Sequence, residues 1–467
     1  MKAKKVSALR KRGLRCDGSR GAEPLIEAVP QLTDTNPNNQ EQLSNLARKT
    51  DTMKTYILRQ PKPVEPQKTP RWPRPKPAAP VTSAALLGRP EATVKGPVLF
   101  IGLDVHNDSI AVSLAPSDTT EVRRYGIIGG EHDDVLKLAK KLAAAHPGTL
   151  LKFCYEAGPR GFALCRCLRS HGLDCILVCP SKIPRKPGDR VKTDRRDADQ
   201  LARLYRAGEL TGLYVPEPVD EAMRDLIRAR FQVGRQQHRA RQQLKMYLLR
   251  HNLRYGGQTS WTPAHLRYLA KIKMPFPTQQ IVFQEMLDVI SEATARLERY
   301  DQEIERAVPG WRWEPAVRAL MSLRGMALLH AATLVAELGD FNRFEHPGQL
   351  MGYLGLVPSE HTTGNDRQQG GITKMGNAPA RRALVEAAWQ YRAPARLSPH
   401  LKKRQEGLPK AITDIAWEAQ RRLHHRYTHL TRVGKKKSQV AVTAVARELA
   451  GFVWAIARQV TPVTRPT

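Results

Sequence analysis

The chain has 467 residues, of which 41% are hydrophobic, and its 76 Lys and Arg against 44 Asp and Glu give a formal net charge of +32 at pH 7. This length is enough for two or three domains with hydrophobic cores, and the charge indicates nucleic acid as the first class of partner and an anionic membrane surface as the second. A transmembrane or secreted protein is not expected, because charged residues interrupt the most apolar C-terminal stretch (440–460) and the basic N-terminus lacks an apolar signal core.

Residues 1–96 differ in composition from the rest of the chain. They carry 19 Lys and Arg against 8 Asp and Glu, and eight prolines lie between Pro61 and Pro80. Such a stretch forms neither sheet ladders nor helices, so we expect a disordered, extended, basic arm. The arm could hold nucleic acid loosely or be a dispensable extension, and the sequence leaves both open.

Residues 97–215 alternate predicted strands and helices. Apolar runs and turn residues place strands at about 98–103, 109–115, 121–128, 150–156 and 174–178, and helices at about 131–146, 159–171 and 193–207. A hairpin is expected through residues 106–108. The resulting order, βββαβαβα, is that of a ribonuclease-H-like (RuvC-like) α/β domain.

Four carboxylates lie where these predicted elements begin or end. Asp104 follows the first strand and Glu156 ends the fourth, whereas Asp194 and Asp197 are three residues apart and share one helix face. Neighbouring carboxylates at ~4 Å repel by several kcal/mol, and bound divalent cations relieve that repulsion. We therefore predict a site for Mg²⁺ at which a phosphodiester is cleaved.

Asp199 lies outside the apolar stripe of the same helix and is expected to be solvated. Each acid alone could instead be a turn residue or a helix starter.

Residues 216–310 are expected to form a helical spacer. A helix over 222–255 carries nine Lys and Arg against one acid, Asp225, and a second helix covers about 280–307. Both have an interrupted apolar stripe, so they could pair as a hairpin or coiled coil. We expect a spacer or dimerisation arm whose basic face contacts nucleic acid.

Residues 311–395 are predicted to form a compact, mostly helical domain, followed by a basic tail at 396–467 that is helical in part. The string Leu323-Arg324-Gly325-Met326 leads into a helix that ends at Gly339-Asp340. A glycine-containing turn that opens a helix presents backbone amides at its positive end, as in phosphate-binding helix-hairpin-helix modules. Ala327 replaces the second glycine of that pattern, so an ordinary helix start fits equally well. The fold class expected is thus α/β followed by all-α.

Five short strings together carry a family resemblance: GLDVH at 102–106, YEAG at 155–158, KTDRRDA at 192–198, GLVP at 355–358 and GITKMGN at 371–377. With these residues in place, the chain resembles the RuvC-like DEDD transposases of insertion sequences, the family that includes Piv-type DNA invertases and bridge-RNA-guided recombinases. The resemblance covers about residues 98–395.

The resemblance implies that Asp104, Glu156, Asp194 and Asp197 bind Mg²⁺. It also implies that a C-terminal serine, usually followed by glycine, attacks DNA and forms a covalent link. The matching string here is His361-Thr362-Thr363-Gly364, so Thr363 stands at the serine position. A threonine hydroxyl can attack phosphorus, but its methyl group crowds the approach and restricts the rotamers. Ser359 is a second candidate that does not match the pattern, and a catalytically impaired protein is a further alternative.

The same resemblance implies a homodimer or homotetramer, with a structured noncoding guide RNA that bridges target and donor DNA. Candidates for phosphate contacts are the basic residues beside the motifs, namely Lys192, Arg195, Arg196, Lys374, Arg381 and Arg382. The preferred hypothesis is a transposase or recombinase that cleaves and rejoins DNA with Mg²⁺. The alternatives are a RuvC-like nuclease on branched DNA and a non-enzymatic nucleic-acid binder. The six cysteines show no paired spacing, and we expect a cytoplasmic, nucleoid-associated protein without a membrane partner.

Overall fold

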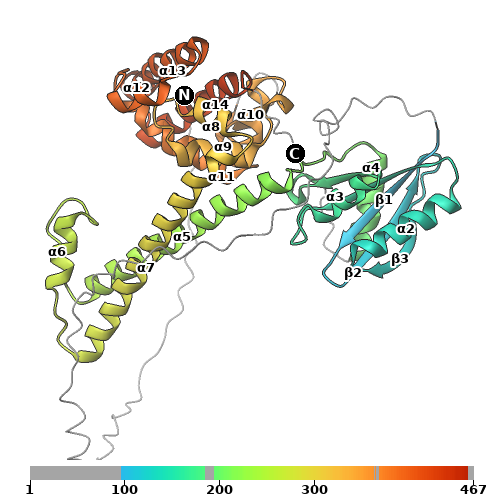
Figure 1. Ribbon diagram of the computed structural model, residues 1–467, viewed down its shortest axis with the longest axis horizontal. Helices are drawn as coiled ribbons and strands as arrows, with labels where there is room; N and C mark the ends of the chain where they lie inside the picture. Colours follow the sequence, from blue (N-terminus) through green and yellow to red (C-terminus); the bar gives the residue numbers. More distant parts are fainter. Residues whose placement is uncertain (1–95, 185–193, 362, 364–365, 367, 461–467) are drawn as a thin grey trace, which may run out of the picture. The chain divides into compact units, whose positions relative to one another are not determined.

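The computed structural model describes residues 96–184, 194–361, 363, 366 and 368–460, apart from the side chains of Asp194 and Arg195. The predicted basic arm at 1–96 therefore lies, except for its last residue, outside the described residues. Within the described part, a mixed α/β sheet is followed by a long helical pair and a largely helical C-terminal region (Figure 1). The predicted succession of α/β and helical regions is confirmed.

A five-stranded sheet forms the first region, in the order β3-β2-β1-β4-β5. Strands β1 and β2 pair antiparallel, as do β2 and β3, whereas β4 runs parallel to both β1 and β5. The elements are β1 (Val98–Val105), β2 (Ser109–Pro116), β3 (Arg123–Gly129), α2 (His132–Ala145), β4 (Leu150–Glu156), α3 (Ala163–Ser170), β5 (Asp174–Val178) and α4 (Asp194–Arg206). All eight predicted elements and the hairpin after β1 are present. Helix α3 begins four residues later than expected.

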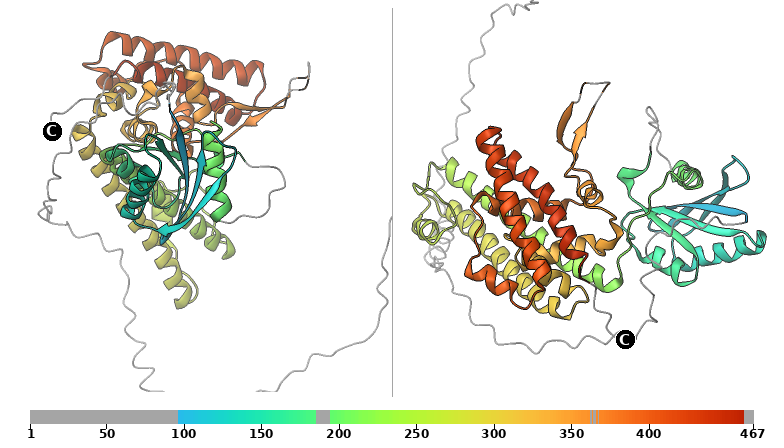
Figure 2. Two further views of the ribbon diagram at one scale, coloured as in Figure 1. Left: turned by 90° about the vertical axis from the view of Figure 1, so that its right-hand side faces the viewer. Right: turned by 90° about the horizontal axis from the view of Figure 1, so that it is seen from above.

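The alternation of side chains along β1 separates the two faces of this sheet. Leu99, Ile101 and Leu103 are buried in a core that also contains apolar residues of α2 and α3. The intervening residues face α4: the ring of Phe100 packs edge-on against Tyr205, with centroids 5.2 Å apart. Helices α2 and α3 thus cover one face and α4 covers the other (Figure 2).

Gly102 sets the distance between α4 and the sheet. A Cβ added at this residue would lie 2.3 Å from the carbonyl oxygen of Ala198 and 2.6 Å from the amide nitrogen of Ala202. Both contacts are with backbone atoms of α4, which cannot rotate away as a side chain could. Only glycine therefore lets the helix lie directly on β1.

The second region is a pair of long helices, α5 (Pro218–Arg250) and α7 (Pro277–Ala307). The two helices share a core and bond across it through Arg230 with Asp301 and Gln237 with Thr294. The sequence did not predict the short helix between them, α6 (Pro263–Lys271). That helix begins at Thr262, whose hydroxyl accepts a hydrogen bond from the amide of His265.

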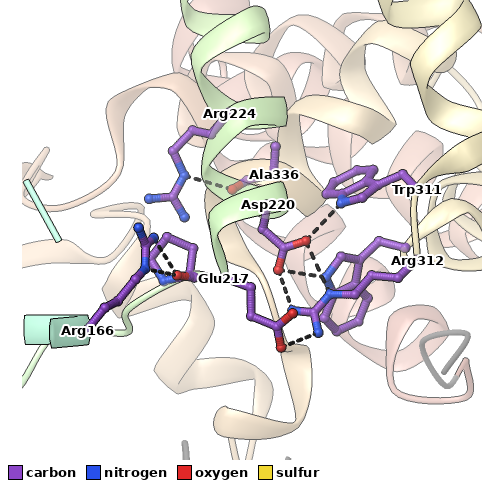
Figure 3. Close-up of polar contacts among 9 residues, drawn as sticks. Arg166, Glu217, Asp220, Arg224, Trp311, Arg312 and Ala336 are labelled. Atoms are coloured by element: carbon purple, nitrogen blue, oxygen red, sulfur yellow. Dashed lines mark hydrogen bonds and ion pairs between the residues drawn. The ribbon is translucent and has the colours of Figure 1, made fainter. Parts of the chain in front are cut away.

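Buried Asp220 ties the beginning of α5 to the chain after α7. Its side chain is 3% exposed and accepts hydrogen bonds from Trp311 Nε1 at 2.8 Å and from the guanidinium of Arg312 (Figure 3). Glu217 pairs with the same arginine at 2.6 Å. Before this point, Arg166 of α3 donates to the carbonyl of Pro216 at 2.6 and 3.1 Å. The beginning of α5 is therefore bonded to Arg312, which follows α7, and to Arg166 of α3.

The C-terminal region packs its helices around one large core. Its elements are α8 (Glu314–Leu320), α9 (Leu328–Leu338), α10 (Pro347–Tyr353), β6 (Pro358–Glu360), β7 (Gln369–Ile372), α11 (Ala378–Ala388), α12 (Pro399–Gln405), α13 (Lys410–Thr428) and α14 (Ser438–Ala457). Within the described residues, α14 is the one helix long and apolar enough to cross a membrane. Its buried residues belong to the same core as those of α9 and α11.

We expect Gly102→Ala to weaken the packing of α4, because the new methyl group would overlap the backbone of that helix. Overpacking of this kind costs about 1–3 kcal/mol in the free energy of unfolding, which chemical denaturation of the full chain would measure. Gly256→Ala is the matched control, since a Cβ there meets no atom within 4 Å. Equal stability of the two variants would contradict the role given to Gly102.

Candidate active site

Two of the predicted acids lie at adjacent ends of the parallel strands β1 and β4. Gly102 is paired with Cys154 in the register of these strands. Asp104 and Glu156 each lie two residues further along, and side chains two apart on a strand point to the same face. Because Gly102 faces α4, both carboxylates belong to the α4 side of the sheet.

Helix α4 carries the other two acids. Asp197 is half-buried and precedes Ala198, whose carbonyl oxygen lies against Gly102. Asp194 begins the helix one turn earlier, but its side chain lies outside the described residues. Among the side chains that the structure does describe, no group of three or more His, Cys, Asp or Glu could hold a metal ion. Asp104, Glu156 and Asp197 are the described members of the predicted set, so these three carboxylates do not by themselves form such a group.

Asp104 has a neighbour that the sequence did not single out. The Nε2 atom of His106 lies 3.2 Å from Asp104 Oδ2, and the side chains of the two residues are 52% and 15% exposed, respectively. The imidazole can hold one orientation of the carboxylate when its proton is on Nε2. The sequence feature that could have drawn attention to His106 is its place at the end of the GLDVH string.

The prediction that Asp199 is solvated is wrong. Its carboxylate accepts a hydrogen bond from Ser113 Oγ of β2 at 2.6 Å and two from Arg124 of β3 at 3.0 and 2.9 Å. Helix periodicity correctly placed Asp199 beside the apolar stripe, but α4 also packs over β2, so a residue beside the stripe meets polar groups of the sheet. These bonds fix the rotation of α4 about its own axis.

The candidate nucleophiles lie on the hairpin formed by β6 and β7. Thr363 is exposed near its tip, where its amide donates to the carbonyl of Asp366 at 3.2 Å and the amide of Asp366 donates back at 3.1 Å. Ser359 lies within β6 and is half-buried. A Cβ at Gly370 of the opposite strand would lie 2.4 Å from Ser359 Oγ. Glycine at 370 thus leaves room for the Ser359 hydroxyl.

The GLVP and GITKMGN strings interlock at the base of this hairpin. Gly355 has a φ of +62°, and an added Cβ would lie 2.2 Å from the carbonyl oxygen of Met375. Gly376 has a φ of +103°, and its Cβ would lie 2.0 Å from the carbonyl oxygen of Tyr353. Each loop therefore needs glycine both for its own backbone and for the approach of the other. The two strings form one structural unit that carries the hairpin.

The six basic candidates differ in their surroundings. Lys192 and the side chain of Arg195 lie outside the described residues, and Arg196 and Lys374 are exposed. Arg381 donates to the carbonyl of Leu354 at 2.8 Å, and Arg382 pairs with Glu386 at 2.6 Å. The last two therefore already have partners within the chain, and Arg381 has a structural role.

Glu337, which the sequence did not indicate, joins three helices beside these loops. It lies near the end of α9 with its side chain fully buried, and it accepts hydrogen bonds from Arg228 of α5 at 2.7 and 2.8 Å. Asn377, which caps α11, donates to it at 2.8 Å. Burial alone would raise the pKa of Glu337, but these hydrogen bonds hold the pKa below its ordinary value.

Two transposase families match parts of this chain. The IS110-type DEDD transposase domain matches residues 101–252, and the Transposase IS116/IS110/IS902 family matches residues 317–405. A protein of Sinorhizobium fredii named as transposase y4qE is 46% identical over 366 residues, which cover 78% of this chain and 90% of that protein. The transposase for insertion sequence element IS1533 of Leptospira borgpetersenii is 31% identical and covers 72% of this chain and 98% of its own.

The chain belongs to the IS110/IS116 family of transposases. Membership in this family makes it a DNA-binding enzyme of transposition that cleaves or recombines DNA. The DEDD domain, which spans β1 to α5, implies the use of a divalent metal. The family resemblance recognised in the sequence is therefore confirmed.

We expect Glu337→Gln to lower the free energy of unfolding at neutral pH by about 1–3 kcal/mol, because it leaves Arg228 without its countercharge. The side chain of Arg228 is 48% exposed, so the loss stays below that of a fully buried pair. Since the pKa of Glu337 is depressed in the folded state, its contribution is present above the ordinary carboxylate pKa and disappears as the pH falls through the folded value.

Denaturation curves of both proteins from neutral to acidic pH would measure this effect, with the two stabilities converging in acid. Glu303→Gln is the control, because Glu303 forms an exposed ion pair with Arg306, and such pairs contribute little. A constant difference at all pH values would show that packing, and not charge, is responsible.

Proposed function

We propose that this transposase cleaves and rejoins DNA strands at a site built from Asp104, Glu156, Asp194 and Asp197 together with a hydroxyl nucleophile of the C-terminal region. The observation that carries the proposal is that Asp104 and Glu156 share the face of the sheet on which α4 packs at Gly102. The sheet order and the position of α4 support a ribonuclease-H-like arrangement.

The four acids would hold Mg²⁺ through carboxylate oxygens, which are the ligands that this ion prefers. When bound, the ion would supply activation of the attacking oxygen and stabilisation of the leaving one. The protein contributes the positions of the carboxylates, through the register of β1 with β4 and the close packing of α4. The bonds of Asp199 to β2 and β3 support a fixed orientation of that helix.

Thr363 is the preferred nucleophile. Its place near the exposed tip of the β6–β7 hairpin is accessible to a DNA strand, whereas Ser359 lies within the hairpin. Attack would form a bond between Thr363 Oγ1 and phosphorus and break the bond from phosphorus to a deoxyribose oxygen. The proton lost by the threonine hydroxyl is balanced by the proton gained by the leaving deoxyribose oxygen. The reverse reaction at a second strand would rejoin the DNA.

The long helical pair would bring two copies of the transposase together. Helix α7 exposes Ile281, Val282 and Val289, which are 57%, 43% and 52% exposed. Val282 and Val289 are seven residues apart and so lie on one face of the helix, as at a coiled-coil seam. We infer a homodimer or homotetramer through this face and a guide RNA on the exposed basic residues of α5.

We expect a covalent protein–DNA adduct when the full chain is incubated with the DNA ends of its element and Mg²⁺ and then denatured. Thr363→Ala should abolish the adduct, because the side chain at position 363 then has no hydroxyl group to attack phosphorus. Thr363→Ser should retain or increase it, because the hydroxyl stays and the crowding methyl group is gone. Asp104→Asn should reduce adduct formation strongly at unchanged DNA binding, and chelation of the metal should have the same effect.

Ser359→Ala is the matched control and should form the adduct as the wild type does. Loss of the adduct in Ser359→Ala alone would transfer the nucleophile to that residue. Metal-dependent nicking without any adduct would instead favour a nuclease that uses water. Adduct formation that is insensitive to Asp104→Asn would refute the acidic site.

We further expect the double variant Val282→Lys, Val289→Lys to reduce self-association, because like charges would face each other at the inferred seam. Light scattering over a concentration series would measure the molar mass of the variant and the wild type. Lysine substitution of exposed Met246, which is 60% exposed on α5, serves as a control for added charge. An unchanged molar mass in the double variant would exclude this face as the interface.

A further inference from the structure

A cavity of about 350 Å³ lies in the C-terminal region at the beginning of α9. Its polar lining consists mainly of the side chains of Arg324, His330, Arg396, Ser398 and Arg404. A water molecule in the liquid takes up roughly 30 Å³, so the cavity has room for a ligand group larger than water. It is formed entirely by residues that the structure describes.

The lining is rich in positive charge, although its His330 is bonded to the carboxylate of Glu386 at 3.4 Å. Three of the lining residues are arginines, and no Asp or Glu lines the cavity. Arg324 donates to the backbone carbonyls of Ala393 and Pro394 at 3.2 and 2.6 Å, and Arg404 donates to the carbonyl of Met326 at 2.8 Å. These bonds hold the two guanidinium groups in place without neutralising them.

The backbone adds to the positive potential. Helix α9 spans eleven residues, and its N-cap, Ala327, provides no side-chain acceptor for the first amides. Unsatisfied amides and the helix dipole both favour an anion at this end. Ala327 and His330 line the cavity, so the cavity lies beside this first turn.

Arg404, which is half-buried, further favours an anion in the cavity. Its Nε atom is buried and has no hydrogen-bond partner in the described part of the chain. Removal of the guanidinium from water lowers the pKa of Arg404, which means that the charged form is held at a cost. A negative charge in the cavity would offset that cost.

We propose that this cavity binds a phosphodiester group of the DNA backbone and thereby positions DNA on the C-terminal region. Guanidinium groups match the oxygens of a phosphate through paired hydrogen bonds, and the Ser398 hydroxyl and the α9 amides are neutral donors of the kind that contact DNA phosphates. DNA is the polyanion on which the proposed function acts, and the inference rests on that function for the choice of DNA.

Substitution of Arg396 tests the proposal with the least disturbance of the fold. Its side chain is exposed and forms no ion pair or hydrogen bond with another described residue, so Arg396→Gln removes a cavity charge without breaking the fold. Arg392→Gln is the matched control, because Arg392 is also exposed, lies four residues away and does not line the cavity. Thermal melting of both variants would verify that they fold as the wild type does.

The measurement is the affinity of the full-length protein for a short labelled DNA duplex over a series of salt concentrations. Each lost phosphate contact reduces the slope of log affinity against log salt by about 1. We expect this reduction for Arg396→Gln and none for Arg392→Gln. Equal slopes in all three proteins, or equal reductions in both variants, would overturn the proposal.

Two further measurements distinguish DNA from other ligands that carry a phosphate group, namely duplex RNA and inorganic phosphate. A slope change with duplex RNA but not with DNA would overturn the choice of DNA. Calorimetric binding of inorganic phosphate that is lost in Arg396→Gln, at unchanged DNA affinity, would identify a site for the free anion and overturn the proposal as well. Because Arg396→Gln is tested by binding and Thr363→Ala by adduct formation, failure of either proposal is visible separately.

Discussion

The contact of Gly102 with the backbone of α4 is the constraint on which the candidate site depends. A helix normally stands off a strand by the thickness of the side chains between them, but here the Ala198 carbonyl lies where a Cβ would be. That approach places the first turn of α4 beside the end of β1, which carries Asp104. With any larger residue at position 102, the acids of the helix would be displaced from those of the strands. The position of α4 on the sheet is thus set by a residue that has no reactive group of its own.

The C-terminal region depends on a comparable constraint. Gly355 and Gly376 each occupy a backbone conformation with positive φ, and each is approached by a carbonyl of the other loop. Nearby, buried Glu337 joins α5, α9 and α11 through Arg228 and Asn377. The hairpin with Thr363 therefore emerges from a base that is rigid for steric and electrostatic reasons, although the hairpin itself has only two short strands.

Much of the fold could be predicted from the sequence because its signals are local. Apolar alternation identified the strands, and the hairpin after β1 and the long helices followed from turn residues and helical periodicity. The late start of α3 had a local cause, since Gly161 takes a positive φ and ends a turn before the helix begins. Helix α6 was missed because its nine residues contain only a short apolar stripe.

The contacts that could not be predicted join residues far apart in the sequence. The partners of Asp199 on β2 and β3, the burial of Glu337 and the network around Asp220 all depend on how helices pack, which periodicity on one element cannot specify. The four acids were predicted from their positions at element ends, and for Asp104 and Glu156 the strand register supports a common face. The arginine cavity was anticipated only through the turn at Gly325, because Arg396 and Arg404 come from a distant segment.

The wide spacing of the candidate site along the chain has a consequence for biosynthesis. A ribosome releases Asp104 and Glu156 well before α4, and the hairpin with Thr363 emerges later still. Because domains fold in the order in which they are translated, a nascent or truncated polypeptide would have a folded sheet but no complete set of reactive groups. The two parts of the proposed site would thus be present together only after most of the chain has been translated.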